Sequence, residues 1–438
     1  MKDRLYIKDL KDHAGKEVAI AGWVDVRRDQ GKMVFFDLRD MTGKVQCVAL
    51  PSHADAIEQA KDIRPEWVLK ISGTVNQRPE KNINKEVLNG EIELEVMGIE
   101  VLSQAIDLPF EKDAEVNLDT YLDYLPLTLR TERGKDIFKV QETIIHAFRE
   151  ALQKESFTEF QCPAIAGGDA EGGAMAFKID YYNDQTAYLA TSPQLYKQIM
   201  TGIFEKVFTT PKIFRGEKHS TTRHLSELTQ MDFEMAFIQD EKDVMEVLEK
   251  VIQHIVKQVA ENHSEVFSRF NTEVPLAPKK FPILTLRQAQ KILGVAEDPD
   301  LEPEQERNIC EWAKKEHHSD FVFITRFPTA KRAFYTYEEP SEAPYSRGFD
   351  LLFRGLEINS GAQRIHNYDS LIKKMKERGL DPEKFSFYLQ TFKYGMPPHG
   401  GCSTGLERMT ARMLELANVK EATLFPRDMN RIDKRLSE

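Results

Sequence analysis

The sequence predicts an α+β protein with at least two domains. At 438 residues the chain is too long for one ordinary hydrophobic core, so two or three domains are expected. Residues 16–105 are a string of short strand segments that Gly, Asp or Pro separates, which predicts a small β-structure. After residue 131, amphipathic helical segments alternate with further strand segments. This second part predicts a larger mixed domain.

Composition and charge restrict the class of protein. The net charge of −11 counts against non-specific nucleic-acid binding, although it leaves room for a local basic face. The N-terminus has no apolar core of a signal peptide, and no apolar run approaches the roughly 18 residues of a membrane helix. The four cysteines are scattered without a C-x-x-C pair, so neither a disulfide framework nor a zinc site is indicated. We therefore expect a cytoplasmic protein with no membrane partner.

The N-terminal strand segments have the order of an OB-fold. Three strands come first, then an amphipathic helix over 52–63, then two more strands. OB-folds commonly bind single-stranded nucleic acid on their open face. Cations, an aromatic ring and an amide lie along the first three strands: Arg27, Arg28, Lys32, Phe35, Arg39 and Gln46. Because adjacent strand residues point to opposite faces, either Phe35 or Phe36 must point away from the core.

The segment from Lys212 to Phe237 predicts an antiparallel hairpin around a charged loop. Its ends alternate apolar and polar residues, as expected for two strands with one buried face. A charged loop is usually only a solvated tip. Here, however, Arg215 directly follows an apolar strand residue, and Asp232 and Glu234 alternate with apolar residues of the return strand. Charges inside the strands favour a pocket for a polyanion.

Several segments connect these two regions or follow them. Residues 106–130 lack periodicity and predict a hinge, and residues 134–155 predict an amphipathic helix followed by a strand over 157–165. A glycine-rich loop then precedes a strand, a turn and a helix that begins near Pro193. Residues 244–263 and 285–318 predict further helices. The pair His317–His318 has no companion ligands at metal spacing, so we interpret it as a solvated helix end.

Oxygen ligands are concentrated in the segment 347–367. Asp350 and Glu357 lie near Ser360, and two carboxylates with a hydroxyl suit Mg²⁺, which prefers oxygen ligands and substrate phosphates. Carboxylates in strands are otherwise surface residues in most proteins. The segment 394–416 is rich in glycine at its start and predicts a strand and a turn that lead into a helix.

These motifs together resemble those of the class II aminoacyl-tRNA synthetases. F-R-x-E, T-x-R-H-L and the acidic return strand resemble motif 2, the G-L-E-R run resembles motif 3, and the helix and strand ending at Pro163 match the loose motif 1. The N-terminal pattern resembles the anticodon-binding domain that aspartyl-, asparaginyl- and lysyl-tRNA synthetases share. S-P-Q-L-Y-K-Q and G-x-E-I-x-S-G-x-Q-R-x-H resemble the compact, archaeal-type aspartyl-tRNA synthetases of class IIb.

The resemblance implies a set of site residues. The catalytic residues would be Arg215, Glu357 and Arg408. The aspartate-binding residues would be Glu171, Gln194, Lys197, Arg215, Asp232, Ser360 and Arg364. The ATP-binding residues would be Arg215, Glu217, Arg223, His224, Leu225, Glu357, Gly405, Leu406, Glu407 and Arg408. The metal ligands would be Asp350, Glu357 and Ser360; the anticodon would meet Arg28, Phe35 and Gln46; and Pro163 would mark the dimer interface.

The implied organisation is an OB-fold anticodon-binding domain over 1–105, a hinge over 106–130 and a class II catalytic domain over 131–438, with an antiparallel sheet flanked by helices. The implied function is ATP- and Mg²⁺-dependent attachment of L-aspartate to tRNA-Asp through aspartyl-adenylate, by a homodimer. Whether tRNA-Asn is a second acceptor stays open. Two alternatives also stay open: a tRNA-independent amide ligase that uses the same adenylate, and a non-catalytic RNA-binding relative.

Overall fold

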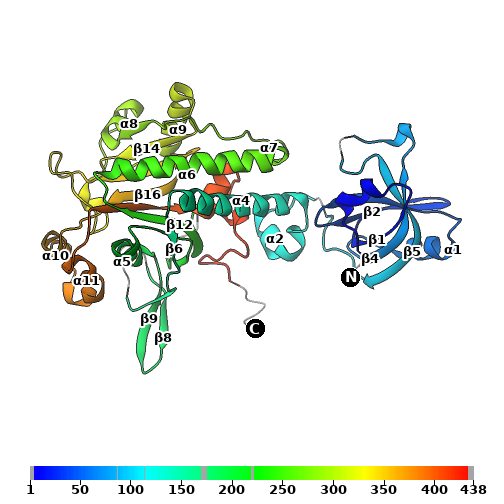
Figure 1. Ribbon diagram of the computed structural model, residues 1–438, viewed down its shortest axis with the longest axis horizontal. Helices are drawn as coiled ribbons and strands as arrows, with labels where there is room; N and C mark the ends of the chain where they lie inside the picture. Colours follow the sequence, from blue (N-terminus) through cyan, green and yellow to red (C-terminus); the bar gives the residue numbers. More distant parts are fainter. Residues whose placement is uncertain (1–3, 86, 113, 169–174, 219–220, 433–438) are drawn as a thin grey trace. The chain divides into compact units, whose positions relative to one another are not determined.

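The computed structural model describes residues 4–85, 87–112, 114–168, 175–218 and 221–432 (Figure 1). The chain divides into two compact units, Met1–Ala114 and Glu115–Glu438. We refer to them as the barrel unit and the sheet unit and describe each by itself. Among the helices of the described residues, none is both long and apolar enough to cross a bilayer.

The barrel unit is a closed five-stranded barrel with the strand order β1-β2-β3-β5-β4. Three strands, a helix and two strands follow one another along the chain, so the predicted OB-fold order is confirmed. Alternate side chains of each strand fill the barrel, and the short helix η1 closes one end with Ile7 and Leu10. The elements are η1 Ile7–His13, β1 Glu17–Gln30, β2 Met33–Asp40, β3 Gly43–Ala49, α1 Ala54–Asp62, β4 Val68–Gln77 and β5 Ile92–Ser103.

The sheet unit is built on a nine-stranded, mostly antiparallel sheet. The strand order is β13-β14-β15-β16-β17-β12-β10-β6, and β11 pairs separately with β12. Only the outer pairs β13–β14 and β10–β6 are parallel. The strands of this sheet are β6 Thr158–Glu159, β10 Lys206–Thr209, β11 Lys212–Phe214, β12 Glu227–Ala236, β13 Ile283–Thr285, β14 Phe321–Thr325, β15 Gly348–Phe353, β16 Leu356–Gln363 and β17 His399–Gly405. A smaller sheet in the order β7-β9-β8 contains β7 Ile165–Ala166, β8 Lys178–Tyr181 and β9 Gln185–Leu189.

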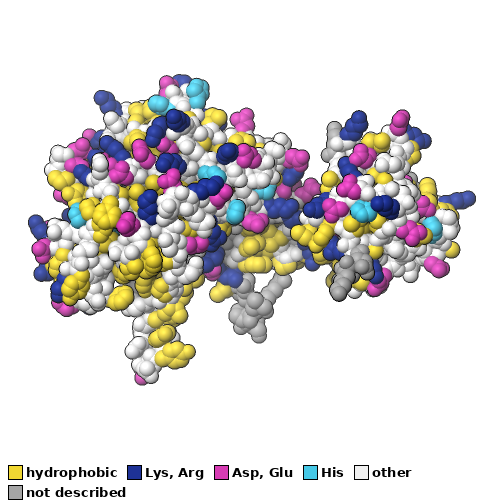
Figure 2. Space-filling view, in the orientation of Figure 1, with side chains coloured by type: hydrophobic (Ala, Val, Ile, Leu, Met, Phe, Trp, Pro, Cys, Tyr) yellow, Lys and Arg dark blue, Asp and Glu magenta, His cyan; other side chains and the backbone are white. Residues whose placement is uncertain are grey.

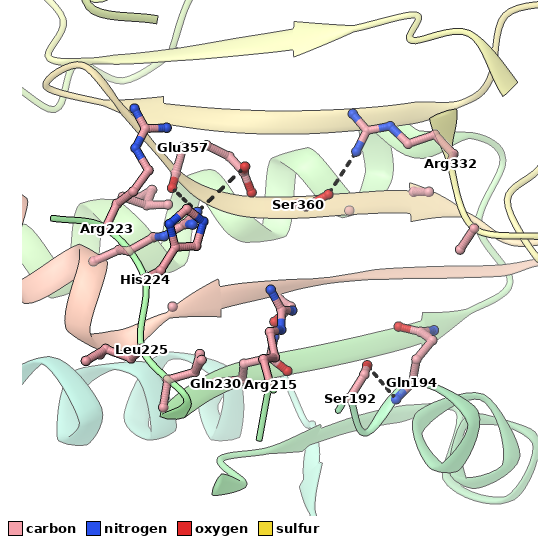
Figure 3. Close-up of a pocket in the computed structure, with 18 of the residues that line it drawn as sticks. Ser192, Gln194, Arg215, Arg223, His224, Leu225, Gln230, Arg332, Glu357 and Ser360 are labelled. Atoms are coloured by element: carbon pink, nitrogen blue, oxygen red, sulfur yellow. Dashed lines mark hydrogen bonds and ion pairs between the residues drawn. The ribbon is translucent and has the colours of Figure 1, made fainter. Parts of the chain in front are cut away.

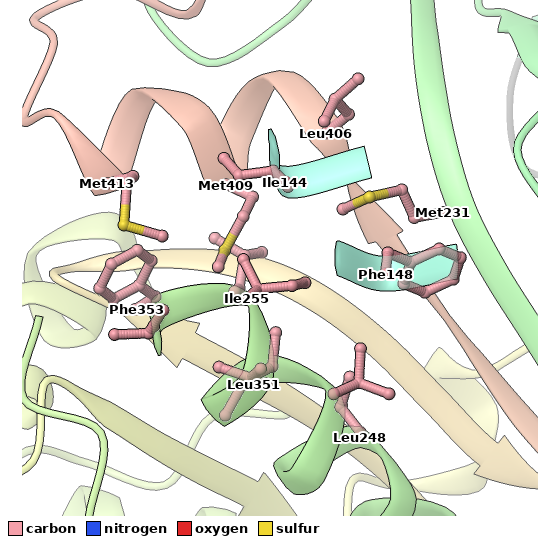
Figure 4. Packing of buried hydrophobic residues seen from close by; sticks show 14 of the residues in the cluster. Ile144, Phe148, Met231, Leu248, Ile255, Leu351, Phe353, Leu406, Met409 and Met413 are labelled. Carbon is pink, nitrogen blue, oxygen red and sulfur yellow. The ribbon is translucent and has the colours of Figure 1, made fainter. Parts of the chain in front are cut away.

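Helices cover one face of the large sheet and leave the other face for the site. The helices α4 and α6 pack side by side, and their apolar stripes meet the sheet in one continuous core (Figure 4). Thr131 begins α4 by accepting a hydrogen bond from Gly134 N, and Asp240 begins α6 in the same way. The helices are α2 Leu118–Asp123, α3 Leu125–Thr128, α4 Glu132–Lys154, α5 Gln194–Phe204, α6 Glu241–Asn262, α7 Ser264–Arg269, α8 Leu286–Leu293, α9 Pro303–His317, α10 Tyr368–Glu377, α11 Ser386–Lys393 and α12 Leu406–Met413. The predicted α+β class is thereby confirmed.

Several local predictions differ from the structure. The segment predicted as a hinge contains the helices α2 and α3, and within the strand predicted over 157–165 only β6 and Ile165, the first residue of β7, are in strands. The apolar face of α4 packs against α6 and the sheet of its own chain. The hairpin was expected to bury one face, but β12 is a central strand and buries both. Phe237, expected in that strand, lies just beyond it with φ 58° and is 69% exposed.

Candidate active site

A cavity of about 290 Å³ opens on the face of the large sheet that the helices α4 and α6 leave uncovered (Figure 3). Its floor consists of β12, β16 and β17, and its walls come from the loop after β11, the start of α5 and the segment 331–336. The predicted site residues on its lining are Gln194, Arg215, Glu217, Arg223, His224, Leu225, Glu357, Ser360, Arg364, Gly405, Glu407 and Arg408. Residues from 194 to 408 in the sequence therefore converge on one space.

The loop between β11 and β12 forms the arginine-rich wall. Antiparallel pairing of Phe214 with Glu227 confirms the predicted hairpin and places Arg215 at the first loop position. A bond from Arg215 N to the backbone oxygen of Ser226 (2.9 Å) closes the base of this loop. The Arg215 Nε atom is buried and has no hydrogen-bond partner among the described residues. A buried donor of this kind normally finds a partner, so it suits a ligand oxygen.

Arg364, on the cavity lining, and three charged side chains buried beneath it form a balanced network. Lys197 Nζ lies 2.9 Å from Asp232 and 3.5 Å from Glu234, and Arg364 Nε donates to Glu234 at 2.9 Å. Burial alone would raise the pKa of Glu234, but the nearby Arg364 and Lys197 charges outweigh it and lower this pKa. For Asp232, burial dominates and raises the pKa. Gln194 joins the network by accepting from Arg364 Nη2 (3.2 Å) and donating to Glu234 (3.2 Å).

The opposite wall carries oxygen-rich side chains on β15 and β16. Asp350 and Ser360 are directly opposed across these two strands, so both reach the same side of the sheet. Glu357 Oε2 lies 3.6 Å from Arg408 Nη1. Crowding by protein atoms, with the negative charge of Asp350 added, raises the pKa of Glu357 to about 7. Among the described residues, no group of three His, Cys, Asp or Glu side chains stands at metal-binding distances.

The strand β17 and the helix α12 supply the last wall. Gly405 ends the strand with extended backbone angles, and the helix begins at the next residue, as predicted. Glu407 accepts the backbone N–H of Thr229 with both oxygens, at 3.0 and 3.1 Å. Arg408 donates to the backbone oxygen of Glu357 at 2.9 Å, which ties this wall to β16.

Some predicted site residues do not reach the cavity surface. Lys197 and Asp232 are fully buried beneath it and contact each other, and Leu406 belongs to the core on the other face. Asp350 lies opposite Ser360 on the neighbouring strand β15 and is not on the lining. Glu171 lies outside the described residues.

Sequence reasoning missed several lining residues. The most consequential is Arg332, whose guanidinium holds both oxygens of Asp350 at 2.8 and 2.9 Å and Ser360 Oγ at 3.0 Å. Glu306, on α9, is not itself on the lining but was also missed, and it accepts from the lining residue Arg223 (Nη1) at 3.1 Å. The adjacent basic residues Lys331 and Arg332 in a loop are a sequence signal that could have identified Arg332. No local pattern distinguishes Glu306 from the other charged residues of its helix. The remaining missed lining residues are Ser192, Leu228, Gln230, Lys331, Ala333, Tyr335, Thr336, Ile358, Gly361, Ala362, Ser403 and Val419.

The three predicted anticodon residues lie on one outer face of the barrel unit. Phe36 is in the barrel core, whereas Phe35 points outward and pairs across the strands with Arg28, as the resemblance predicted. Gln46 lies opposite Asp37 on the neighbouring strand. Arg39, noted as a candidate cation, is instead 8% exposed. It pairs with Asp25 and Glu66 and therefore supports the fold.

The two units combine a five-stranded barrel with a mostly antiparallel sheet that carries the cavity. The chain belongs to the tRNA synthetases of class II (D, K and N), because the model of that family matches residues 117–429. A second family model, described as "OB-fold nucleic acid binding domain", matches residues 18–102. The resemblance drawn from the motifs is therefore confirmed.

Individual relatives cover almost the whole chain. The "Aspartate--tRNA(Asp/Asn) ligase" of Thermus thermophilus is 41% identical over 437 residues, which is 98% of this chain and 99% of the relative. The "Aspartate--tRNA(Asp) ligase" of Pyrococcus abyssi is 37% identical over 430 residues, or 95% and 96% of the two chains. Among solved structures, asparaginyl-tRNA synthetase from Pyrococcus horikoshii, complexed with asparaginyl-adenylate, has a TM-score of 0.91 at 32% identity and covers 99% of this chain and 100% of that chain.

Proposed function

We propose that this protein is an aspartate--tRNA ligase that forms aspartyl-adenylate from aspartate and ATP and transfers the aspartyl group to tRNA-Asp. The observation that carries the proposal is the cavity itself. Its walls present Arg215, Arg223 and Arg408, which suit phosphate oxygens, next to the buried Arg364 network, which suits a carboxylate. The aspartate ligases among its relatives support the same activity.

In the first step, an oxygen of the aspartate α-carboxylate attacks the α-phosphorus of ATP. The bond from that phosphorus to the bridging oxygen breaks, and pyrophosphate leaves. Positioning and charge stabilisation do most of the work in phosphoryl chemistry. Arg215 stabilises the charge that develops on the α-phosphate, and Arg408 and Arg223 hold the other phosphates. The remaining ATP contacts come from Glu217, His224, Leu225, Gly405 and Glu407, with Leu406 packed beneath them.

In the second step, the 3′-hydroxyl of the terminal tRNA adenosine attacks the carbonyl carbon of the adenylate. The bond between that carbon and the phosphate oxygen breaks, and AMP leaves with the hydroxyl proton. No side chain is required as a dedicated base, because the mixed anhydride is already activated.

Mg²⁺ fits the acidic wall of the cavity. Burial and, after it, the negative charge of Asp350 raise the pKa of Glu357, so a cation beside these two carboxylates would be favourable. Their carboxylates and Ser360 Oγ are hard oxygen ligands, and ATP supplies the others. When bound, the metal neutralises charge on the phosphates. These three residues are therefore our proposed ligands.

We propose that aspartate is recognised through the buried network rather than by a lone cation. Arg364 lines the cavity and faces the substrate side-chain carboxylate, while Glu234 and Gln194 hold its guanidinium. Lys197 acts indirectly, because it holds Asp232 and Glu234, and Glu234 in turn holds Arg364. Glu171 would bind the substrate ammonium.

The barrel unit would read the anticodon. Phe35 provides a ring for base stacking beside the cation Arg28, and Gln46 provides an amide for a base edge. Single-stranded loops expose such edges, so this face fits an anticodon loop. We place the protein in the cytoplasm, where charged tRNA is used.

We further propose a homodimer around Pro163. Pro163 and Ile165 are exposed in the single chain, and Ile203, Phe204 and Phe237 expose large apolar areas in the same unit. Apolar side chains also follow the protruding β8–β9 hairpin (Figure 2). Exposed apolar surface of this extent commonly marks an interface. Sedimentation as a monomer at micromolar concentration would contradict the proposal.

Two assays test the function and its alternatives. Aspartate-dependent ATP–pyrophosphate exchange should be present, and its absence would favour the non-catalytic RNA-binding alternative. Charging of tRNA-Asp and tRNA-Asn transcripts, side by side, then separates a tRNA ligase from an amide ligase. The same experiment decides whether tRNA-Asn is a second acceptor.

A further inference from the structure

Arg332 is held between two of the three proposed metal ligands, Asp350 and Ser360. Its Nη1 atom lies 2.9 Å from Asp350 Oδ1 and 3.0 Å from Ser360 Oγ, and its Nη2 atom lies 2.8 Å from Asp350 Oδ2 (Figure 3). One nitrogen is thus within hydrogen-bond distance of oxygens from two strands. A Mg²⁺ ion bound to these oxygens requires contacts of roughly 2.0–2.1 Å. The nitrogen and the metal cannot both occupy that position.

The surroundings keep Arg332 in this place. The Phe327 ring lies 3.9 Å from its Cζ atom, and Arg378 donates to the backbone oxygen of Arg332 at 3.1 Å. Gly348 leaves room for the side chain, since a Cβ atom there would stand 3.3 Å from Arg332 Nε. The side chain is only 15% exposed, so its pairing with Asp350 is poorly screened.

One donor of Arg332 is left over in this arrangement. Its Nε atom is buried and has no hydrogen-bond partner among the described residues. An unpartnered buried donor is costly, so a second position that satisfies it is favoured when an acceptor enters the cavity. Arg332 lies on the cavity lining, so ATP bound in the cavity would bring phosphate oxygens within its reach as acceptors.

We propose that Arg332 is a built-in substitute for the metal: it binds Asp350 and Ser360 in the free enzyme and has to release them when a divalent cation binds. The inference rests on the proposed function for the identity of the metal ligands. The guanidinium and the metal then compete for the same oxygens, and ATP favours the metal by offering Arg332 phosphate oxygens. Arg332 is therefore a positioning residue that couples the binding of metal to the binding of ATP.

The test measures Mn²⁺ binding directly, by electron paramagnetic resonance of free Mn²⁺ without nucleotide. Arg332→Gln should bind Mn²⁺ roughly tenfold more tightly than the native protein, a typical factor for coupled ligands. The Mn²⁺ affinity of Arg332→Lys should lie between those of Arg332→Gln and the native protein. A lysine ammonium is a point charge and cannot hold both Asp350 oxygens as the planar guanidinium does. The double variant Arg332→Gln/Asp350→Asn should lose the tighter Mn²⁺ binding of Arg332→Gln.

Arg326→Gln is the matched control. Arg326 is 18% exposed and is also held by two carboxylates, Glu241 and Glu342, but it lies away from the cavity lining. Its Mn²⁺ affinity should equal that of the native protein. A second measurement is the thermal midpoint, since ligands that bind the folded state raise it. Saturating Mg²⁺ should restore stability to Arg332→Gln but not to Arg326→Gln.

A folded Arg332→Gln variant that binds Mn²⁺ no tighter than the native protein overturns the inference, because Arg332 would then only orient Asp350. If Arg332→Gln does not fold, the same criterion applies to Arg332→Lys. Failure of the proposed function appears separately, as absence of aspartate-dependent pyrophosphate exchange in the native protein. Mn²⁺ binding without nucleotide does not depend on that result.

Discussion

His399 is a fully buried histidine whose tautomer follows from its partners. Its Nδ1 atom lies 2.9 Å from the backbone oxygen of Pro397, which can only accept, so Nδ1 carries the proton. Its Nε2 atom therefore accepts from Gln198 Nε2 at 2.8 Å, and Tyr388 donates to the other end of Gln198 at 3.0 Å. Burial lowers the pKa of His399 to about 4. This chain of bonds lies directly behind Arg364, whose N–H bonds the His399 backbone oxygen.

The first prediction is a loss of stability in acid that depends on His399. In the unfolded chain its pKa is about 6.5, so between about pH 6.5 and pH 4 the unfolded state binds more protons and stability falls as pH falls. The expected loss is about 3 kcal/mol, which His399→Gln should not show. Urea unfolding across this range measures it. Tyr388→Phe, which keeps the histidine, should follow the native curve, and parallel curves for all three proteins would contradict the prediction.

The second prediction concerns discrimination between aspartate and asparagine. The two amino acids differ little in size, so charge has to separate them, and Arg364 is the cation on the cavity lining. Asparagine would place donors against the Arg364 donors. A site built for one hydrogen-bonding group typically rejects the mismatched analogue by roughly 10⁴-fold or more.

The variant Arg364→Leu tests this role. Aspartate-dependent pyrophosphate exchange should fall by several orders of magnitude, and the gap to asparagine should narrow. Asparagine use should stay low, because Glu234 is left with Lys197 and Gln194 and no new partner for an amide appears. Exchange rates for both amino acids decide the matter. An unchanged ratio in a folded variant would show that Arg364 only supports the strand.

At the scale of elements, the C-terminal segment 418–432 holds the loop that carries Arg223 and His224. Val419 N bonds the backbone oxygen of Thr222 at 3.0 Å, and Ser226 N bonds that of Arg427 at 2.8 Å. The segment is itself clamped by a buried ion pair between Lys420 and Asp428. Burial opposes the Asp428 charge, but Lys420 and backbone N–H groups outweigh it and lower its pKa. The segment therefore positions one wall of the cavity from outside it.

The third prediction follows from this clamp. Asp428→Ala should raise the KM for ATP in pyrophosphate exchange about tenfold, equivalent to about 1.4 kcal/mol, while the KM for aspartate changes little. The control is Arg431→Gln, because Arg431 pairs with the exposed Asp119 and Asp123. Such surface pairs contribute little, so its KM values should stay near native. Equal effects on both substrates would show a general loss of structure instead.

At the scale of the whole molecule, the chain has two compact units with separate cores. The fourth prediction is that a fragment beginning at Glu115 keeps aspartate-dependent pyrophosphate exchange and loses most tRNA charging. It should begin there and not at Thr131, because the second compact unit begins at Glu115. Phe35→Ala in the full chain is the matched variant: charging should fall by roughly 10- to 100-fold at unchanged exchange, from the loss of one stacked base. Undiminished charging by the fragment would contradict the anticodon assignment.

Local patterns in the sequence determined much of this protein. Apolar periodicity and turn residues identify the barrel strands, the helices α4, α6 and α12 and the β11–β12 hairpin, because these elements follow from alternation within a few neighbouring residues. Arg215, Arg364 and Arg408 were identified because motifs surround them. The tertiary structure alone decided which charges face each other. Lys197 became a buried partner of Asp232, and Arg332 took the position of a cation between Asp350 and Ser360. These pairings join residues from different strands and loops, and the energy of a charge depends on burial and on partners that no local pattern records.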